Sequence, residues 1–528
     1  ADALANKGNL SSPVQALQGQ VPGVIITRNS SAPGDESWSM SLRGAVSKNS
    51  ASPLVIIDGV EYESVNDLRL INPSDIESMN FLKDAAASIY GSKAAGGVVL
   101  ITTKQAKGDS KVKVDYNGSY TYKRIGLSAE VMSLDEWSSG IIMGLMNDYN
   151  MGFTSEDPRN HTWYKYATLA KEYRNQWING NPLNMGNVDD MTFFDTDWQD
   201  VMWGDSWSTN HELSVAGGGK NTYRFSLGYM YDDSNLKWGN NNNQRINLRL
   251  NNKFSITDNF TIQSVISYNR QDQVAPTQIG AALTVNSQQP GFPSSTINGK
   301  PYGWGSDWAT PNWKCELGGD NKLNVNALNI SETLRYEIFK GFTANAVLGY
   351  NHSTATRDTK QLAVDFYQYD GVTPEPIKGQ AQKDTYYENS FSTTDFYTAQ
   401  AYLNWLHTFK QNHNLSLMAG LQYNMKQYEY SKFKAMDIQP ELEIINGAGE
   451  KTITGANNWE EAIMSYYGRA NYDYKGKYML EGQFRYDGSS KFKKDNRWAF
   501  FWGASTGWRI SEEAFMQSLS PIISNLKL

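Results

Sequence analysis

Strict alternation of polar and apolar residues dominates the chain after about residue 108. The clearest segments run from Tyr223 to Tyr231, from Tyr478 to Tyr486 and from Trp498 to Trp508. Successive side chains of a β-strand point to opposite faces, so each segment has one apolar and one polar face. Each segment runs for about ten residues, the length that a tilted strand needs to cross a bilayer. The pattern therefore predicts membrane-spanning strands.

About twelve such segments follow one another, and the connections between them are of two kinds. Some are tight turns, as at Ala216–Gly219 and Tyr474–Gly476, and others are long. Short turns on one side and long loops on the other are typical of outer-membrane barrels. A soluble β-sandwich or propeller is disfavoured, because its buried faces are usually rich in Val, Ile and Leu rather than Tyr, Trp and Phe. The predicted strands start near residues 111, 209, 221, 244, 259, 323, 341, 395, 413, 461, 477 and 497, and the long connections cover roughly 125–208, 272–322, 354–394 and 431–460.

Before residue 107 the pattern is different, because short helical and strand-like pieces alternate. Val24–Ile26, Leu54–Ile57 and Val98–Thr102 are predicted strands, and Asp58–Gly59 is a turn signal. A helix is predicted over Ala85–Tyr90. The chain therefore divides into a small α/β domain, residues 1–107, and a β domain, residues 108–528.

Composition narrows the function classes. The chain has 528 residues and a net charge of -7, which argues against nucleic acid as a partner. Mean hydropathy is -0.56, and no stretch approaches the roughly 18 apolar residues of a transmembrane helix. The single cysteine, Cys315, excludes an internal disulfide. The chain starts at Ala1 without an apolar signal region, so we interpret it as a mature or trimmed chain.

Three contiguous motifs in the first domain carry a resemblance. They are Ser41–Gly44, Pro53–Val60 and the run KDAAASIYGSKAAGGVVLITTK at Lys83–Lys104. Together they resemble the plug of TonB-dependent receptors, and the Lys83–Asp84 pair is similar to the SusC/RagA branch. In the second domain, Arg485–Phe492 and Gly507–Glu513 also look like that branch. The resemblance extends over almost the whole chain.

The resemblance implies a transmembrane β-barrel occluded by a small N-terminal α/β plug domain. Barrels of this family have roughly 22 antiparallel strands, of which this chain would hold about twelve. The remaining strands must then come from a longer precursor or a second piece, because unpaired strand edges are not tolerated in lipid. The N-terminal extension and the TonB-contacting segment typical of the branch are not recognised in this sequence.

The plug motif residues are interpreted as structural. The glycines permit tight turns, and Arg43, Lys83 and Asp84 are expected to pair with the polar inner wall of the barrel. Cargo contact is expected instead at three plug apices, Ser30–Ser37, Val46–Ser52 and Glu61–Asp67, and the candidate ligand-binding residues are Asn49, Tyr62 and Glu63. The motif residues given a structural role are Arg43, Gly44, Asp58, Gly59, Lys83, Asp84, Tyr90, Gly91, Gly96 and Gly97.

Nothing in the sequence predicts catalysis, a cofactor or a metal. The five histidines lack metal-ligand spacing, and Gly217–Lys220 is a hairpin turn rather than a phosphate-binding loop. Asp195, Asp197 and Asp200 lack the Gly and the closing Glu of a calcium loop. Tryptophans in the predicted loops could stack on sugars or pack against a partner, and both remain open. They are Trp163, Trp177, Trp203, Trp207, Trp304, Trp308 and Trp313.

The function implied by the resemblance is active import across the outer membrane. The cargo would be oligosaccharides or oligopeptides, handed over by a SusD-like surface lipoprotein and driven by energy relayed through TonB. Other partners would be outer-membrane lipid and the remainder of the barrel. The alternative is a secreted or surface β-rich protein for glycan binding or adhesion, without transport activity. An enzyme is not expected.

Overall fold

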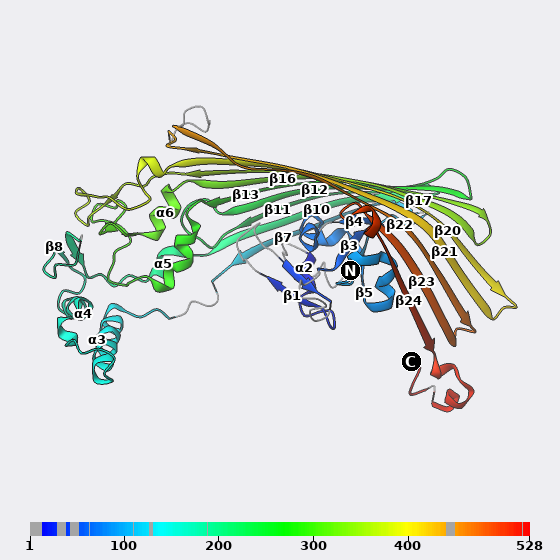
Figure 1. The fold of residues 1–528 in the computed structure, drawn as a ribbon, viewed down its shortest axis with the longest axis horizontal. Helices are drawn as coiled ribbons and strands as arrows, with labels where there is room; N and C mark the ends of the chain where they lie inside the picture. Colours follow the sequence, from blue (N-terminus) through cyan, green and yellow to red (C-terminus); the bar gives the residue numbers. More distant parts are fainter. Residues whose placement is uncertain are drawn as a thin grey trace.

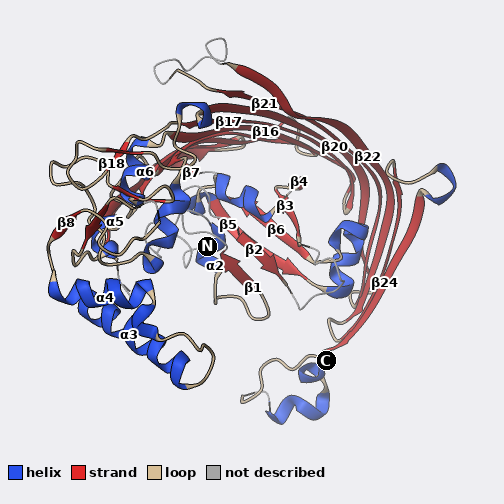
Figure 2. Ribbon diagram, turned by 60° about the vertical axis from the view of Figure 1, so that its left-hand side comes forward, coloured by secondary structure: helices blue, strands red, loops and turns tan. Residues whose placement is uncertain are grey.

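A computed structural model describes residues 13–28, 38–42, 52–62, 64–108, 110–125, 130–186, 188–439, 449–519 and 521–528. Arg43, Gly44, Asn49 and Glu63 lie outside these ranges, as does most of the two apices at 30–37 and 46–52. A wide curved sheet wraps around a small N-terminal domain, which lies in its concave side (Figures 1 and 2).

The N-terminal domain contains a four-stranded sheet of order β4-β3-β6-β5. β3 and β6 are parallel, whereas the other neighbours are antiparallel. The first turn of the sheet is Asp58–Gly59, where φ is 49° and 85°, as in the tight turns that favour glycine. Buried Val14, Leu68 and Val99 belong to its core. The elements are α2 (Pro13–Leu17), β1 (Ile25–Arg28), β2 (Trp38–Ser41), β3 (Leu54–Ile57), β4 (Val60–Tyr62), η1 (Val65–Leu70), η2 (Pro73–Asp75), β5 (Ile76–Leu82), η3 (Asp84–Ala94) and β6 (Val98–Thr103).

The curved sheet, here called the wall, has twelve strands in the described residues, each antiparallel to the next in chain order. Ten of the twelve start within about three residues of the sequence prediction. β20 and β22 start earlier, at Tyr386 and Glu450, because their first residues are polar on both faces and show no alternation. The strands are β7 (Ser110–Lys123), β10 (Ser206–Gly218), β11 (Thr222–Asp233), β12 (Asn242–Ser255), β13 (Phe260–Pro276), β16 (Asp320–Phe339), β17 (Phe342–Gln361), β20 (Tyr386–Phe409), β21 (His413–Met436), β22 (Glu450–Tyr474), β23 (Tyr478–Ser489) and β24 (Trp498–Trp508).

The two faces of the wall differ in chemistry. The concave face carries buried polar residues such as Arg224, Asn247 and Arg485, whereas the convex face exposes aromatic and aliphatic residues. One convex row of side chains crosses five strands, and a second aromatic row lies eight residues further along β23, about 27 Å away. Two aromatic rows with an apolar band between them are typical of a membrane-spanning barrel. The first row is Phe409, His413, Tyr474, Tyr478 and Trp508, and the second contains Tyr466, Tyr486 and Phe500.

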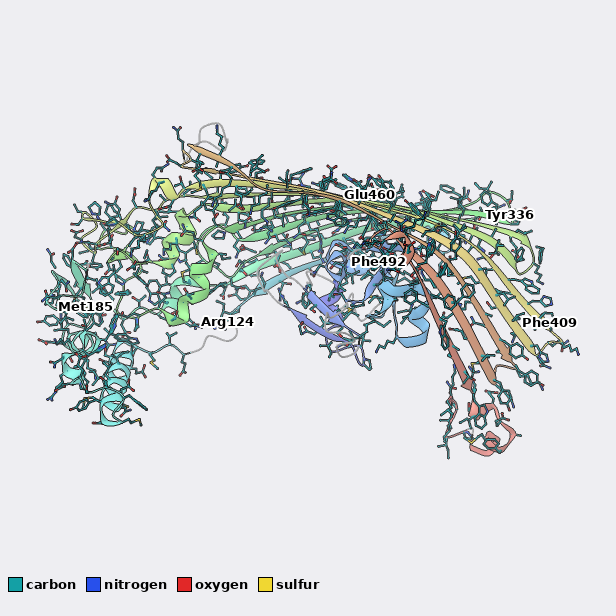
Figure 3. All side chains as sticks on the ribbon, viewed as in Figure 1. Arg124, Met185, Tyr336, Phe409, Glu460 and Phe492 are labelled. Atoms are coloured by element: carbon teal, nitrogen blue, oxygen red, sulfur yellow. The ribbon has the colours of Figure 1, made fainter. Side chains whose placement is uncertain are left out.

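The connections separate to the two ends of the wall, as predicted. Tyr336 and Phe409 mark the short-turn end in Figure 3, and Met185 marks the long-connection end. The long connections fold into a layer with its own buried clusters. No helix in the described residues has the length and apolar character needed to cross a membrane. The layer contains α3 (Leu134–Asn150), η4 (Pro158–Asn160), α4 (Thr162–Glu172), β8 (Trp177–Asn179), β9 (Asp190–Thr192), α5 (Trp198–Met202), η5 (Ile279–Ser287), β14 (Gly303–Trp304), β15 (Trp308–Ala309), α6 (Pro311–Leu317), β18 (Phe366–Tyr367), β19 (Pro374–Glu375) and η6 (Gln382–Asp384). Outside it, η8 (Lys494–Asn496) connects β23 to β24, and η9 (Ile510–Glu512) and η10 (Ala514–Leu519) follow β24.

Candidate functional site

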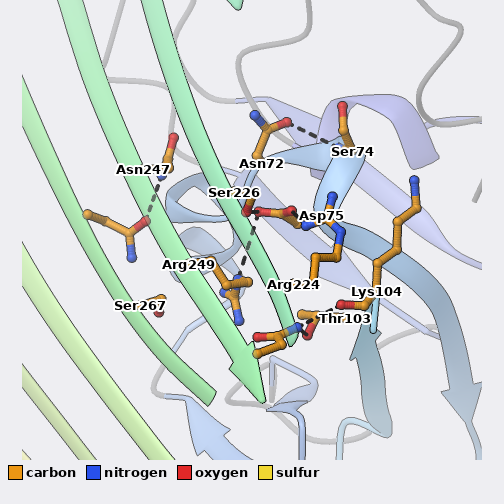
Figure 4. A network of polar contacts seen from close by, with 12 residues as sticks. Asn72, Ser74, Asp75, Thr103, Lys104, Arg224, Ser226, Asn247, Arg249 and Ser267 are labelled. Carbon is orange, nitrogen blue, oxygen red and sulfur yellow. Dashed lines mark hydrogen bonds and ion pairs between the residues drawn. The ribbon is translucent and has the colours of Figure 1, made fainter. Parts of the chain in front are cut away.

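A buried ion cluster joins the N-terminal domain to β10–β12 of the wall (Figure 4). Asp75, 3% exposed, accepts a hydrogen bond from Arg224 at 2.6 Å and another from Ser226 Oγ at 2.9 Å. Arg224 also lies 3.4 Å from Glu212. Arg249 Nε lies 3.9 Å from the second Asp75 oxygen. Because these groups are withdrawn from water, each depends on its partners for compensation of its charge.

Asp58 extends this cluster from the turn between β3 and β4. Its carboxylate accepts from the Thr103 N–H at 2.9 Å and from Thr103 Oγ1 at 2.8 Å. Arg249 Nη1 lies 3.6 Å from the same carboxylate. Asn251 Nδ2 donates to Thr103 Oγ1 at 2.9 Å and to the Lys104 carbonyl oxygen at 2.7 Å. The end of the domain's sheet where β3 and β6 finish and β5 begins is therefore held against this part of the wall.

A second contact zone, against β17–β23, contains fewer charge pairs. Glu61 pairs with Lys93 at 2.5 Å within the N-terminal domain and accepts from Asn424 of β21 at 2.7 Å. Arg485 of β23 donates to the Ile89 carbonyl oxygen at 3.1 Å. These contacts use one charged group against a neutral partner across the interface, in contrast to the charge pairs at β10–β12.

A cavity of about 390 Å³ lies between the domain and β17–β23. Side chains of both signs and several amides and tyrosines line it, so it is suited to a polar, hydrogen-bonding occupant rather than an apolar one. It is lined from the domain by Glu61, Tyr90 and Lys93, and from the wall by Tyr402, Gln422, Asn424, Arg469 and Arg485 among others.

Aromatic residues gather in the layer of long connections. Phe292 lies with its ring centre 4.3 Å from that of Trp308, and Trp163 packs against Trp304. Most of the tryptophans predicted to lie in loops are anchored here by their indole N–H groups, for example Trp177 to Asp190 and Trp304 to the Asp190 carbonyl oxygen. Their packing positions the layer, whereas Trp207 lies on β10 with 45% exposure.

Two acidic residues make this layer sensitive to pH. Burial raises the pKa of Asp190 to about 6, and burial together with Asp189 raises the pKa of Glu375 to about 7. The folded layer then holds these protons more tightly than the unfolded chain, whose ordinary values are 3.8 and 4.5. The free energy of unfolding of the layer should therefore fall as the pH rises from these ordinary pKa values to the raised ones.

We expect hydrogen exchange of α4 and β9 to be slower at about pH 5 than at about pH 8. Glu375→Gln should reduce the difference by slowing exchange at the higher pH. Exchange rates of the layer that change with pH only as the intrinsic rate does would contradict this prediction.

Among the described residues, no group of three or more His, Cys, Asp or Glu side chains is arranged to hold a metal ion. Asp197, one of the aspartates considered for an ion site, accepts from the N–H groups of Gln199 and Asp200 at the start of α5. Asp195 accepts from the Leu134 N–H and pairs with Arg174. Both carboxylates therefore have structural partners.

Comparison with known proteins identifies the family. The model of the TonB-dependent Receptor Plug Domain matches residues 1–98. TonB-dependent receptor P39 of Formosa agariphila is 30% identical over 526 residues, 98% of this chain and 45% of that protein. TonB-dependent receptor SusC of Bacteroides thetaiotaomicron is 27% identical over 572 residues, 99% of this chain and 50% of that protein. The structure of the RagAB peptide transporter has a TM-score of 0.75 at 20% identity, covering 97% of this chain and 57% of that chain.

The chain belongs to the SusC/RagA-type TonB-dependent receptors. Its fold is accordingly that of an outer-membrane β-barrel with a plug, and the N-terminal domain is the plug. The predicted fold class and location are confirmed. The chain spans about half the length of the curated relatives it matches.

The structure places the predicted plug residues in different roles. Asp58 is part of the ion cluster, and Tyr90 lines the cavity. Lys83 was expected to pair with the wall, but it donates to the Pro22 carbonyl oxygen within the plug at 3.1 Å, so that expectation was wrong. At Gly97, where φ is 90°, an added Cβ would meet Leu42 Cδ1 at 2.5 Å. Gly96 precedes β6, and Asp84 begins η3.

Tyr62, the one candidate ligand residue in the described ranges, is half-buried at the end of β4 and packs against the plug core. Burial raises the pKa of its hydroxyl, and nearby Arg249 opposes this shift. Its contact with cargo stays a prediction. Asp75, Arg224 and Arg249 were not among the predicted site residues, although both arginines stand on the polar faces of otherwise aromatic or aliphatic strands.

Proposed function

We propose that residues 1–107 are the plug domain and residues 108–528 part of the barrel wall of an active importer. The observation that carries this proposal is a plug tied to the concave face of the wall by polar contacts, among them Asp75–Arg224 and Glu61–Asn424. Such contacts can break and re-form with water as a temporary partner, so a pulling force can move the plug reversibly. TonB would transmit that force from the inner membrane.

The asymmetry of the interface suggests where the passage forms. The charge cluster ties the plug to β10–β12, whereas the cavity and contacts without charge pairs across the interface lie against β17–β23. Moving the plug away from β17–β23 breaks fewer charge pairs than moving it away from β10–β12. Cargo would therefore pass between the plug and β17–β23, along the polar residues that line the cavity.

Oligosaccharides and oligopeptides are the two cargo classes proposed, and a SusD-like surface lipoprotein is the proposed partner over the long-connection end. The likeness to the RagAB peptide transporter supports peptides, and the abundance of Tyr and Trp supports sugars. The relatives are named as receptors and transporters, which supports transport rather than catalysis. The remaining barrel strands would close the wall around the plug.

Paired cysteines test the passage in the complete transporter. Val60 of β4 faces Gly349 of β17, where an added Cβ would lie 2.9 Å from the Val60 methyl carbons. The variant Val60→Cys/Gly349→Cys should form a disulfide across the cavity side. We expect energised uptake of labelled oligosaccharide or oligopeptide to stop when this pair is oxidised and to return on reduction. Native Cys315 is buried in α6 and need not be replaced.

A matched pair lies on the other wall. An added Cβ on Gly228 of β11 would lie 2.8 Å from Asn72 Nδ2, so Asn72→Cys/Gly228→Cys joins the plug to the β10–β12 side. Oxidation of this pair should leave uptake active, and a protonophore should abolish it in both reduced variants. Equal loss for both oxidised pairs would contradict the proposed passage, and uptake that resists the protonophore would contradict active import.

Asn49, Tyr62 and Glu63 remain the proposed cargo contacts on the plug. Tyr62→Phe keeps the packing of the ring and removes only the hydroxyl, so it separates binding from folding. Loss of one hydrogen bond of about 1 kcal/mol would weaken cargo affinity about fivefold. Titration calorimetry, with the unmodified protein as control, measures this change in cargo affinity. The same measurement applies to Asn49→Ala and Glu63→Ala. Unchanged affinity in all three variants would exclude these two apices from binding.

A further inference from the structure

The convex face of the wall carries an apolar groove of about 560 Å³ across β20–β23. Two neighbouring rows of the sheet form it. One row runs Trp405, Leu417, Ala470 and Gly482 from β20 to β23, and the next runs Leu403, Ala419, Gly468 and Phe484.

Small and large residues are sorted within these rows. Ala419, Gly468, Ala470 and Gly482 are adjacent and form a floor without bulky side chains. Around them, Leu403 is 47% exposed and Phe484 is 46% exposed, so large apolar side chains stand at the sides. The result is a depression whose lining is almost entirely hydrocarbon.

The groove faces lipid rather than the lumen. On β23, Gln483 and Arg485 are buried on the concave side, and Arg485 contacts the plug, so Gly482 and Phe484 point the opposite way. The groove is therefore continuous with the membrane-contacting surface of an outer-membrane barrel.

The groove also has a defined depth. From Ala470 the strand β22 runs five residues to the turn at Lys475, about 17 Å along the strand. At a tilt of about 45° this is roughly 12 Å of depth, and the second row, at Gly468, lies roughly 17 Å deep, so the groove reaches the middle of a hydrocarbon core about 30 Å thick. The short-turn end of such barrels faces the periplasm, so an acyl chain of the periplasmic leaflet reaches the groove from this side.

Basic residues stand at the membrane edge below the groove. The three turns beneath it, at 339–342, 409–413 and 474–478, each carry a lysine: Lys340, Lys410 and Lys475. Lys475 Nζ lies 5.4 Å from the ring centre of Tyr474, in the aromatic row that marks the edge. Ammonium groups at this level attract the phosphate of a lipid whose chain lies above them.

We propose that this groove binds a phospholipid of the periplasmic leaflet, with one acyl chain over the small residues and an anionic headgroup at Lys410 and Lys475. The groove replaces the loose contact of bulk lipid with a shaped apolar surface, and the lysines add charge complementarity. The bound lipid would lie directly behind Tyr402 and Arg469, which line the plug cavity on the other face of the same strands.

Native mass spectrometry of the complete transporter in mild detergent tests this site. The probes are phosphatidylglycerol, which is anionic, and phosphatidylcholine, which is zwitterionic. Nothing lies within 4 Å of a Cβ added at Gly482, so Gly482→Phe fills the groove without displacing backbone. We expect it to lower retention of phosphatidylglycerol about tenfold, the change when roughly two methylene groups lose their burial.

Ala399→Phe is the matched control, since Ala399 pairs with exposed Leu348 on the same convex face outside the groove. It should retain lipid like the unmodified protein. Lys410→Ala/Lys475→Ala should remove the preference for phosphatidylglycerol over phosphatidylcholine. The proposal would be overturned if Gly482→Phe retained as much phosphatidylglycerol as the unmodified protein, or if the unmodified protein retained no lipid. If Gly482→Phe dissociates a dimer and leaves lipid retention unchanged, the groove is instead a contact surface between two copies of the chain.

Discussion

Asp75→Ala is expected to loosen the plug more than any other single side-chain truncation at the interface. The change leaves Arg224 and Arg249 buried without the carboxylate between them, and Ser226 without its acceptor. Removing one partner from a buried ion pair costs about 3–5 kcal/mol. The plug should therefore become sensitive to trypsin at lower urea concentration, and the complete barrel should show more frequent openings in planar-bilayer recordings.

An exposed ion pair on the same protein is the control. Lys220 and Asp258 lie 3.0 Å apart in neighbouring turns, with Asp258 fully exposed. Asp258→Ala should leave both readouts unchanged, because solvent screens such pairs. A plug in Asp75→Ala that resists trypsin as well as the unmodified plug would show that the cluster does not hold it.

Gly91→Ala should have the second large effect. Gly91 interrupts η3 with φ 73° and ψ -153°, a conformation that is essentially restricted to glycine and costs other residues about 1–3 kcal/mol. An added Cβ would also overlap the Asp487 carboxylate and lie 2.8 Å from Arg485 Nε. Because Arg485 is one of the wall's contacts to the plug, we expect a loss of about 3 kcal/mol or more in the same urea and trypsin assay.

Gly19→Ala separates the backbone cost of a positive φ from the steric overlap of the added Cβ. Gly19 has φ 71°, but nothing lies within 4 Å of its added Cβ. It should show the backbone cost alone, about 1 kcal/mol. Equal effects at the two glycines would mean that contact with Asp487 and Arg485 adds nothing.

The strand pattern was predictable because every strand must present apolar residues to lipid on alternate positions. Strand ends near short turns, such as Phe342 and Tyr478, were found to within a residue. The early residues of β20 and β22 carry no such signal, since polar side chains occupy both faces there.

The plug contacts were less predictable, because they depend on which concave residues the register brings opposite the plug. Arg224 and Arg249 were readable as charges on inward faces, and such charges need partners. That Asp75 and Asp58 are those partners follows only from the arrangement in space. Lys83 shows the converse, since a charged motif residue found its partner inside its own domain.

The length of the central strands has a further consequence. β20 and β22 have 24 and 25 residues, about 80 Å of strand, which at a tilt of about 45° is roughly 57 Å of height against an apolar band of about 25 Å. The wall at β20–β22 thus rises about 30 Å above the membrane surface, whereas β23 and β24, with 12 and 11 residues, are much shorter. An extended chain of about nine amino-acid units has the length of this raised part of the wall. Selection at the cell surface could then depend on the length of an oligomer as much as on the chemistry of its units.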